Sequence, residues 1–219
     1  MSAPELAGAA PEPGASRRWW LLPAAFVLAW CVGAATSALV GMWPALGVTG
    51  VGTGTMALVL DGQALRPLFR PRAAAIAAGV MIGAAMTAAT YALFPLVSHI
   101  SVALARDTTR LYANLNASSH VWLSLVLVPV VIGEEVVWRG LVFGALARRF
   151  GLTAAVLLGA PLYALAHAPV GSTVLVLAAL GCGLIWGGLR ATTASLLAPL
   201  AAHLLWDETV LFLAPIAAQ

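Results

Sequence analysis

Residues 133–140 read Gly-Glu-Glu-Val-Val-Trp-Arg-Gly and lie inside an apolar run over residues 121–146. A charged side chain at the centre of a membrane costs about 2.5–3.5 kcal/mol on insertion scales, so adjacent carboxylates in such a run need partners. In a helix, Glu135 and Arg139 are four residues apart with the acid first, which lets them form an ion pair. Glu134 points about 100° away around the helix axis. The stretch therefore predicts a membrane helix in which Glu134 faces a polar cavity.

The composition is typical of a membrane protein with several spans. Of the 219 residues, 62% are hydrophobic and 9% are charged, and the mean hydropathy is +0.97. Soluble domains average about 25% charged residues. The 11 basic residues are all arginine, and they lie mostly between the apolar runs without forming a basic stripe. We therefore expect membrane lipid as a partner and no nucleic acid.

The apolar runs predict an all-α, polytopic transmembrane bundle of about seven spans plus one interfacial amphipathic helix. The predicted spans are 19–42, 45–60, 73–97, 120–146, 152–168, 172–189 and 194–215, with a loop at 61–72 and the amphipathic helix within 98–120. We expect residues 1–18 to form a disordered cytoplasmic tail. Residues 19–219 are predicted to form a single transmembrane domain, with the motif-bearing part at about 120–215.

The arginines predict the orientation in the membrane. One side would hold Arg17, Arg18, Arg66, Arg70, Arg72, Arg148, Arg149 and Arg190, and the other side only Arg106 and Arg110. Cytoplasmic connections carry an excess of basic residues. We therefore expect a cytoplasmic amino terminus. The expected location is the plasma membrane of a bacterium, as an integral membrane protein.

Two further predicted spans carry ionisable side chains at interior positions. His167 lies one turn after Tyr163, and His203 lies one turn before Asp207. A lone intramembrane histidine is often a hydrogen-bonded packing residue. Burying such groups on three spans costs least if they meet Glu134 in one cavity, where they satisfy one another.

Such a cavity is compatible with three kinds of chemistry. A buried carboxylate can activate water as a general base, with one histidine sharing the proton and another supporting an oxyanion. Glu134, His167 and His203 could instead hold a divalent metal such as zinc, so the expected cofactor is either none or such a metal. The same groups could relay protons in a transporter, but the sequence lacks the matching interrupted halves typical of one.

Three motifs occur in order on successive apolar segments: Glu134-Glu135-x-x-x-Arg139, Tyr163-x-x-x-His167 and His203-x-x-x-Asp207. Together they resemble the CPBP family, the CAAX-protease and bacteriocin-processing group also called Abi, over roughly the last 90 residues. The resemblance implies an intramembrane endopeptidase, similar to type II prenyl-protein endopeptidases, whose substrate is a membrane-associated or lipidated peptide. We expect this peptide to enter from the cytoplasmic side or laterally from the lipid. The family is commonly named as metalloproteases, but a metal-free glutamate mechanism is also compatible with the resemblance, and we favour it.

The resemblance also implies roles for the motif residues. Glu134 and His167 would activate water, His203 and Asp207 would occupy the oxyanion-stabilising positions, and Glu135 and Arg139 would maintain the shape of the site. The alternative is a non-catalytic bacteriocin-immunity or membrane scaffolding protein, in which the same polar cluster serves packing.

The sequence departs from the family pattern at two motif positions. Tyr163 replaces the usual phenylalanine and adds a hydroxyl that needs a partner. Asp207 stands where the prenyl-protein enzymes have asparagine. An ionised carboxylate cannot donate to an oxyanion, so Asp207 must either be protonated or orient His203.

Overall fold

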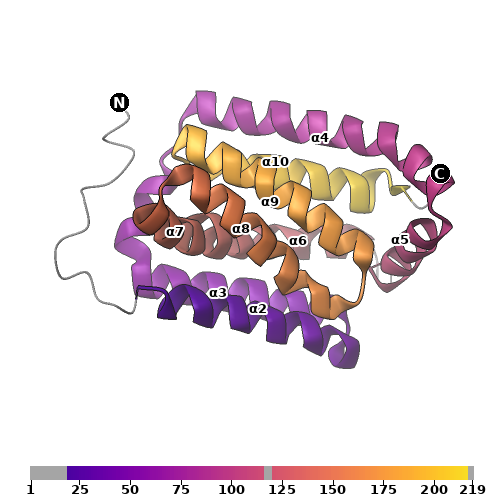
Figure 1. Ribbon diagram of the computed structural model, residues 1–219, viewed down its shortest axis with the longest axis horizontal. Helices are drawn as coiled ribbons and strands as arrows, with labels where there is room; N and C mark the ends of the chain where they lie inside the picture. The colour runs from indigo at the N-terminus through magenta and orange to yellow at the C-terminus, as the bar shows by residue number, and fades with distance from the viewer. Residues whose placement is uncertain (1–18, 116–119, 217–219) are drawn as a thin grey trace.

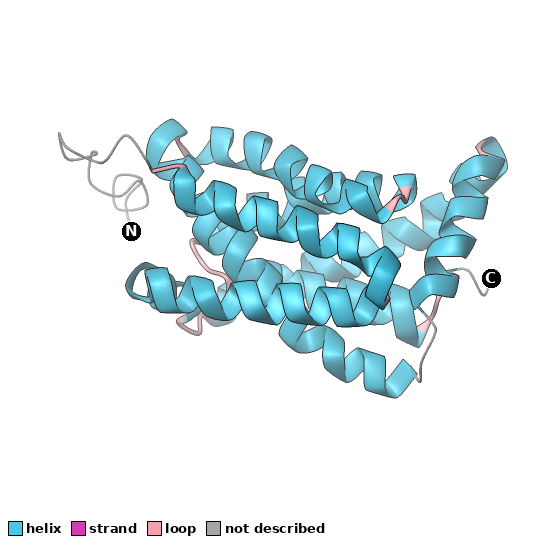
Figure 2. Cartoon of the chain, turned by 90° about the horizontal axis from the view of Figure 1, so that it is seen from below, coloured by secondary structure: helices cyan, strands magenta, loops and turns pink. Residues whose placement is uncertain are grey.

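The computed structural model describes residues 19–115 and 120–216, and the regular structure in this part of the chain is entirely helical (Figure 1, Figure 2). The predicted all-α class is therefore confirmed. The α-helices are α2 (Leu21–Val40), α3 (Met42–Leu65), α4 (Ala73–Ile100), α5 (Val102–Leu115), α6 (His120–Glu135), α7 (Phe143–Phe150), α8 (Leu152–His167), α9 (Thr173–Thr193) and α10 (Leu197–Asp207). Short helical turns connect some of them: the 3₁₀ turns η1 (Arg66–Phe69) and η3 (Ala168–Val170), and the π turns η2 (Val136–Val142) and η4 (Glu208–Leu213).

Within the described residues, five helices are long and apolar enough to cross a membrane. They are Leu21–Val40, Met42–Phe69, Ala73–Ile100, Leu152–Val170 and Thr173–Thr193. The other two predicted spans fall on the composite helices α6–η2–α7 and α10–η4, each of which contains a π turn. The protein is thus an integral membrane protein, and the count of seven spans stays a prediction. The predicted tail at 1–18 lies outside the described residues.

Two predicted boundaries are wrong. The predicted loop at 61–72 is helical over its first part, because Asp61 (φ −129°, ψ 23°) kinks α3 without ending it. The turn between the first two helices is at Gly41 and not at 43–44. Gly41 has φ +88°, a conformation that favours glycine, and this lets the chain reverse between α2 and α3.

One end of the bundle gathers most of the described arginines, and we call it the arginine-rich end. It holds Arg66, Arg70, Arg72, Arg148, Arg149 and Arg190, where η1, α7 and α9 end and α4 begins (Figure 1). Leu196 N donates to Leu68 O at 2.9 Å. Arg72 donates to the carbonyl oxygens of Thr193 and Ala194, at 3.3 Å in each case. These bonds join the end of α9 to the connection that precedes α4.

The opposite end carries α5, and we call it the α5 end. Asp107 of α5 accepts hydrogen bonds from Ser172 Oγ (3.1 Å) and Val174 N (2.8 Å) at the start of α9. Leu111 of α5 belongs to the same buried cluster as Met42 at the start of α3. The predicted amphipathic segment therefore folds as a helix that packs across this end of the bundle.

Glycines bring α3 and α6 into backbone contact. A Cβ at Gly133 would overlap the carbonyl oxygen of Gly50, and a Cβ at Gly54 would lie 2.5 Å from Gly133 Cα. Neither position has room for a side chain, so the close approach of the two helices depends on glycine. The contact fixes the position of α6 one residue before Glu134.

We expect Gly133→Ala to destabilise the protein by about 1–3 kcal/mol, because the added methyl group overpacks the contact between α3 and α6. The matched control is Gly52→Ala on α3, where a Cβ would meet no heavy atom within 4 Å. Thermal unfolding of the detergent-purified variants measures the difference. Equal melting temperatures for the two variants would contradict the close approach.

Candidate functional site

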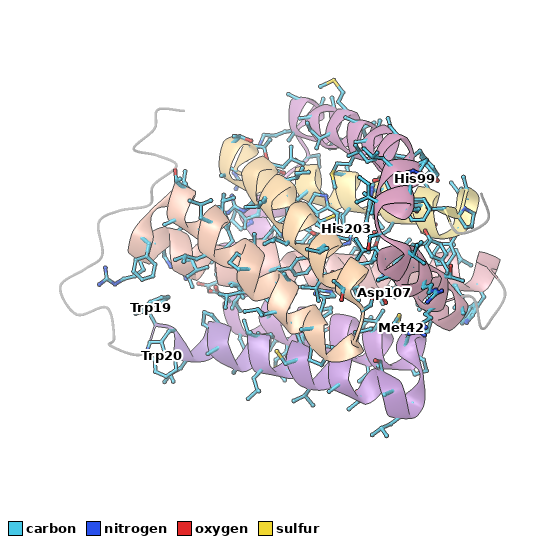
Figure 3. The ribbon with its side chains drawn as sticks, turned by 45° about the vertical axis from the view of Figure 1, so that its right-hand side comes forward. Trp19, Trp20, Met42, His99, Asp107 and His203 are labelled. Atoms are coloured by element: carbon cyan, nitrogen blue, oxygen red, sulfur yellow. The ribbon has the colours of Figure 1, made fainter. Side chains whose placement is uncertain are left out.

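A cavity of about 230 Å³ lies inside the bundle, and polar side chains gather in its wall. Glu134 of α6, Tyr163 and His167 of α8, and His203 and Asp207 of α10 all contribute to the wall, which is otherwise mostly apolar. Glu134, His167 and His203 are buried, and Figure 3 shows His203 in the interior of the bundle. Three segments that are far apart in the sequence thus place ionisable groups around one cavity.

Behind the cavity wall, Glu135 and Arg139 form a buried ion pair. Arg139 Nη1 lies 3.3 Å from Glu135 Oε1, and the two side chains are 3% and 1% exposed. Glu135 Oε1 also accepts a hydrogen bond from His203 Nδ1 at 2.8 Å. The pairing expected from the four-residue spacing is present, and the same carboxylate also holds the histidine of α10.

His203 lies between two carboxylates. Its Nδ1 faces Glu135, and its Nε2 is 3.2 Å from Asp207 Oδ2 and 3.9 Å from Glu134 Oε2. A neutral imidazole has one N–H donor, whereas the imidazolium form has two and can donate to Glu135 and Asp207 together. The geometry therefore favours the orienting role for Asp207 that the sequence left open.

Aromatic rings enclose the buried cations. Trp186 of α9 stacks on His203, with the ring centroids 3.7 Å apart and the planes at 21°. The guanidinium carbon of Arg139 lies 4.3 Å from the centroid of the Tyr163 ring and 5.0 Å from that of Trp186. Desolvated cation–π contacts contribute about 2 kcal/mol or more. Sequence reasoning missed Trp186, because no motif contains it and a tryptophan in an apolar run carries no signal of its own.

Tyr163 links the motif of α8 to that of α6. Its hydroxyl donates to Glu134 Oε2 at 2.7 Å, so the group that distinguishes it from phenylalanine has a buried partner. The carbonyl oxygen of Tyr163 lies 2.8 Å from His167 Nδ1. A carbonyl can only accept, so Nδ1 carries a proton, and Nε2 is the acceptor of the neutral ring. The side chain of Tyr163 thereby orients Glu134, and its backbone carbonyl orients His167.

A π turn follows each of the two acidic motifs. The turn η2 begins directly after Glu135, and η4 begins directly after Asp207. Such turns interrupt the α-helical hydrogen-bond pattern and are frequent at functional sites. Within η2, the carbonyl of Arg139 accepts a hydrogen bond from Arg190 Nε at 3.1 Å. Arg190, which the sequence analysis used only to predict topology, therefore also supports the backbone beside the site.

The polar groups are not arranged as a metal site. Among the described residues, no three His, Cys, Asp or Glu side chains are grouped to hold a metal ion. Glu134 accepts the Tyr163 hydroxyl, and both ring nitrogens of His203 face carboxylates. Zinc bound by Glu134, His167 and His203 would have to displace a carboxylate from one ring nitrogen of His203. The metal alternative from the sequence therefore lacks a preformed ligand set.

The fold and the cavity define a helical integral membrane protein with a cavity lined by ionisable side chains. Residues 116–209 match the family model described as type II CAAX prenyl endopeptidase Rce1-like. This region contains all three motifs, so the family resemblance that they predicted is confirmed. The matched family is one of intramembrane CAAX endopeptidases. No curated protein and no solved structure matches the chain.

The variant Arg139→Met tests the buried ion pair. Breaking such a pair costs about 3–5 kcal/mol, because the remaining carboxylate loses its compensating charge. Arg148→Met, at an exposed position of α7, is the control and should change stability by no more than about 0.5 kcal/mol. Unfolding in detergent measures both variants, and equal losses would contradict a structural role for the pair.

Proposed function

We propose that the protein is an intramembrane endopeptidase that hydrolyses a peptide bond in a membrane-associated or lipidated peptide. The observation that carries the proposal is that Glu134, His167 and His203 line one cavity and lie within the residues matched by the family model. Ionisable residues inside membrane segments are costly and are usually kept for function. The mostly apolar wall suits a substrate segment that is itself apolar.

In this proposal Glu134 is the general base. Each oxygen of a carboxylate has two acceptor positions, so the hydrogen bond from Tyr163 leaves positions for a water molecule. Glu134 takes a proton from the water molecule while the oxygen of that water attacks the carbonyl carbon of the substrate. The proton then passes to the leaving nitrogen as the C–N bond breaks. His167 can accept and return this proton, because its Nε2 is the acceptor of the neutral ring.

His203 stabilises the oxyanion that forms on the substrate carbonyl. As an imidazolium it supplies positive charge beside the base, with Nε2 3.9 Å from Glu134 Oε2. Electrostatic stabilisation is most effective when the charge is already in place before the reaction. Contacts with Glu135, Asp207 and Trp186 hold the ring in one orientation. In this proposal those three residues act by positioning the ring of His203.

A non-catalytic function, as an immunity or scaffolding protein, is the second candidate. The observation that favours it is the mutual satisfaction of Glu135, Arg139 and His203, which needs no substrate. A polar cluster of this kind can orient membrane helices through hydrogen bonds alone. The two functions differ in whether Glu134 is needed for a chemical step or only for packing.

Glu134→Gln tests the proposed base. The substitution keeps the size of the side chain but removes the basic carboxylate, so we expect a rate loss of about 10²–10⁴-fold, the contribution typical of a general base. The probes are internally quenched peptides that end in a CAAX sequence, with and without a prenyl group, in proteoliposomes. The control is Glu208→Gln, whose carboxylate accepts a hydrogen bond from Ser124 at 2.6 Å outside the cavity wall.

Unchanged cleavage by Glu134→Gln would overturn the proposed mechanism. A wild-type protein that folds but cleaves none of the probes would favour the non-catalytic function. Comparison of the melting temperatures of the variants separates a chemical effect from a folding effect.

A chelator challenge tests the metal-free form of the mechanism. Because both ring nitrogens of His203 are already engaged with carboxylates, we expect activity to persist in a strong chelator of divalent metals. Metal analysis of the active protein, made on the same sample, should give less than one metal ion per chain. Loss of activity that added zinc restores would contradict this expectation.

A further inference from the structure

We infer that the protein receives its substrate from the non-cytoplasmic side of the membrane, and that the substrate is an exported, membrane-associated peptide with an apolar segment. The inference rests on the proposed function for the reaction itself. The side of access follows from two independent observations: the half of the bundle in which the cavity lies and the distribution of the arginines.

The cavity occupies only one half of the bundle. Its wall is formed by residues within 30–37 of α2, 42–46 of α3, 90–94 of α4, 108–112 of α5, 127–134 of α6, 163–170 of α8 and η3, 174–186 of α9, and 203–216 of α10, η4 and the residues that follow. In most of the long helices these residues lie between the middle of the helix and the α5 end, and on α9 they run from its first turn to Trp186, just past the middle. None of the wall residues comes from η1, η2 or α7. The cavity therefore extends from the polar groups toward α5.

The other half of the bundle is closely packed. Between the polar groups and the arginine-rich end, the buried side chains include Leu65, Val136, Val137, Leu141, Val142, Phe143 and Leu196. Interiors packed in this way contain few voids larger than a water molecule. A peptide can therefore reach Glu134 through the α5 half and not through the arginine-rich half.

Figure 3 shows the two ends with the site between them. Trp19 and Trp20 lie at one end, Met42, His99 and Asp107 lie at the other, and His203 lies in between. The rings of Trp19 and Phe150 are in contact, with centroids 5.7 Å apart, which places the Trp19 end beside the end of α7. The half of the bundle that contains the cavity, which we call the hollow half, is thus the half farther from Arg148 and Arg149.

The arginines indicate which half faces the cytoplasm. Six described arginines lie at the arginine-rich end, and only Arg106 and Arg110 lie on α5. Basic residues are enriched in the cytoplasmic connections of membrane proteins. The closely packed half, which ends in the arginine-rich end, then faces the cytoplasm, and the hollow half faces the non-cytoplasmic side.

Helix α5 shapes the entrance on that side. Thr108, Leu111 and Tyr112 contribute to the cavity wall. The Tyr112 hydroxyl donates to the carbonyl of Val210 in η4. Burial raises the pKa of Tyr112 to about 12, so the hydroxyl remains a donor at physiological pH. Together with the hydrogen bonds of Asp107 to the start of α9, this contact holds α5 across the cavity, where an exported peptide would arrive.

Thiol accessibility tests the side of access without any need for activity. The background is the double variant Cys31→Ser/Cys182→Ala, which removes both native cysteines. Single cysteines are then introduced as Ser37→Cys in the cavity wall, Ala103→Cys on the exposed surface of α5, and Gln63→Cys at an exposed position of α3 near the arginine-rich end. A small charged methanethiosulfonate reagent is applied to right-side-out and to inverted membrane vesicles from the expressing cells.

We expect the cysteines at positions 37 and 103 to react about tenfold faster or more in right-side-out vesicles, because the charged reagent would otherwise have to cross the bilayer. The cysteine at position 63 should react faster in inverted vesicles. The inference is overturned if position 37 follows position 63, if position 37 reacts in neither vesicle type while both controls react, or if the two controls react from the opposite sides.

The same pattern is expected when Glu134→Gln is added to each variant. The labelling result is therefore independent of catalysis. A failure of the proposed protease activity and a failure of the proposed side of access can be told apart.

Discussion

The ion pair between Glu135 and Arg139 is the interaction on which the rest of the site depends. Both groups are buried, and an unpaired charge in their place would cost several kcal/mol. The same carboxylate holds His203, which Asp207 and Trp186 contact from two further directions. Helices α6 and α10 are therefore joined through charges that cannot separate without large cost, and Trp186 of α9 stacks on His203 of this cluster. The geometry around Glu134 follows from this arrangement, although Glu134 itself is not part of the ion pair.

The sequence predicted those features that depend on local spacing, and it missed those that depend on packing. The pairing of Glu135 with Arg139 follows from helical periodicity alone, and apolar runs of sufficient length predicted the helices. The stacking of Trp186 on His203 and the hydrogen bond from Tyr163 to Glu134 join residues of different helices, and no local pattern encodes them. The π turns were missed for a related reason, because a change of hydrogen-bond register leaves the hydrophobic composition unaltered.

The two halves of the bundle meet different physical demands. A hydrolase in a membrane must admit water and substrate to a carboxylate without opening a path across the bilayer, because polar pores conduct ions and protons. Here the polar groups lie at the inner limit of a cavity, and closely packed aliphatic side chains lie beyond them. In the proposed function, a cavity that is reached from one half of the bundle reconciles access with a sealed membrane. Its position near the middle of the bundle leaves half of the helix length to form the seal.

The contact between α3 and α6 has a consequence for natural sequence variation. Gly50 and Gly54 precede the region matched by the family model, yet both approach the backbone of Gly133, next to the proposed base. A Cβ at Gly54 would lie 2.5 Å from Gly133 Cα, and a Cβ at Gly50 would lie 3.1 Å from the carbonyl oxygen of Val130, one turn earlier on α6. A mutation that enlarges either residue would therefore press on the backbone of α6, even though neither residue belongs to a recognised motif. Natural variants at these two positions should therefore be rarer than at neighbouring exposed positions of α3, and their loss of fitness would not be explained by the family signature.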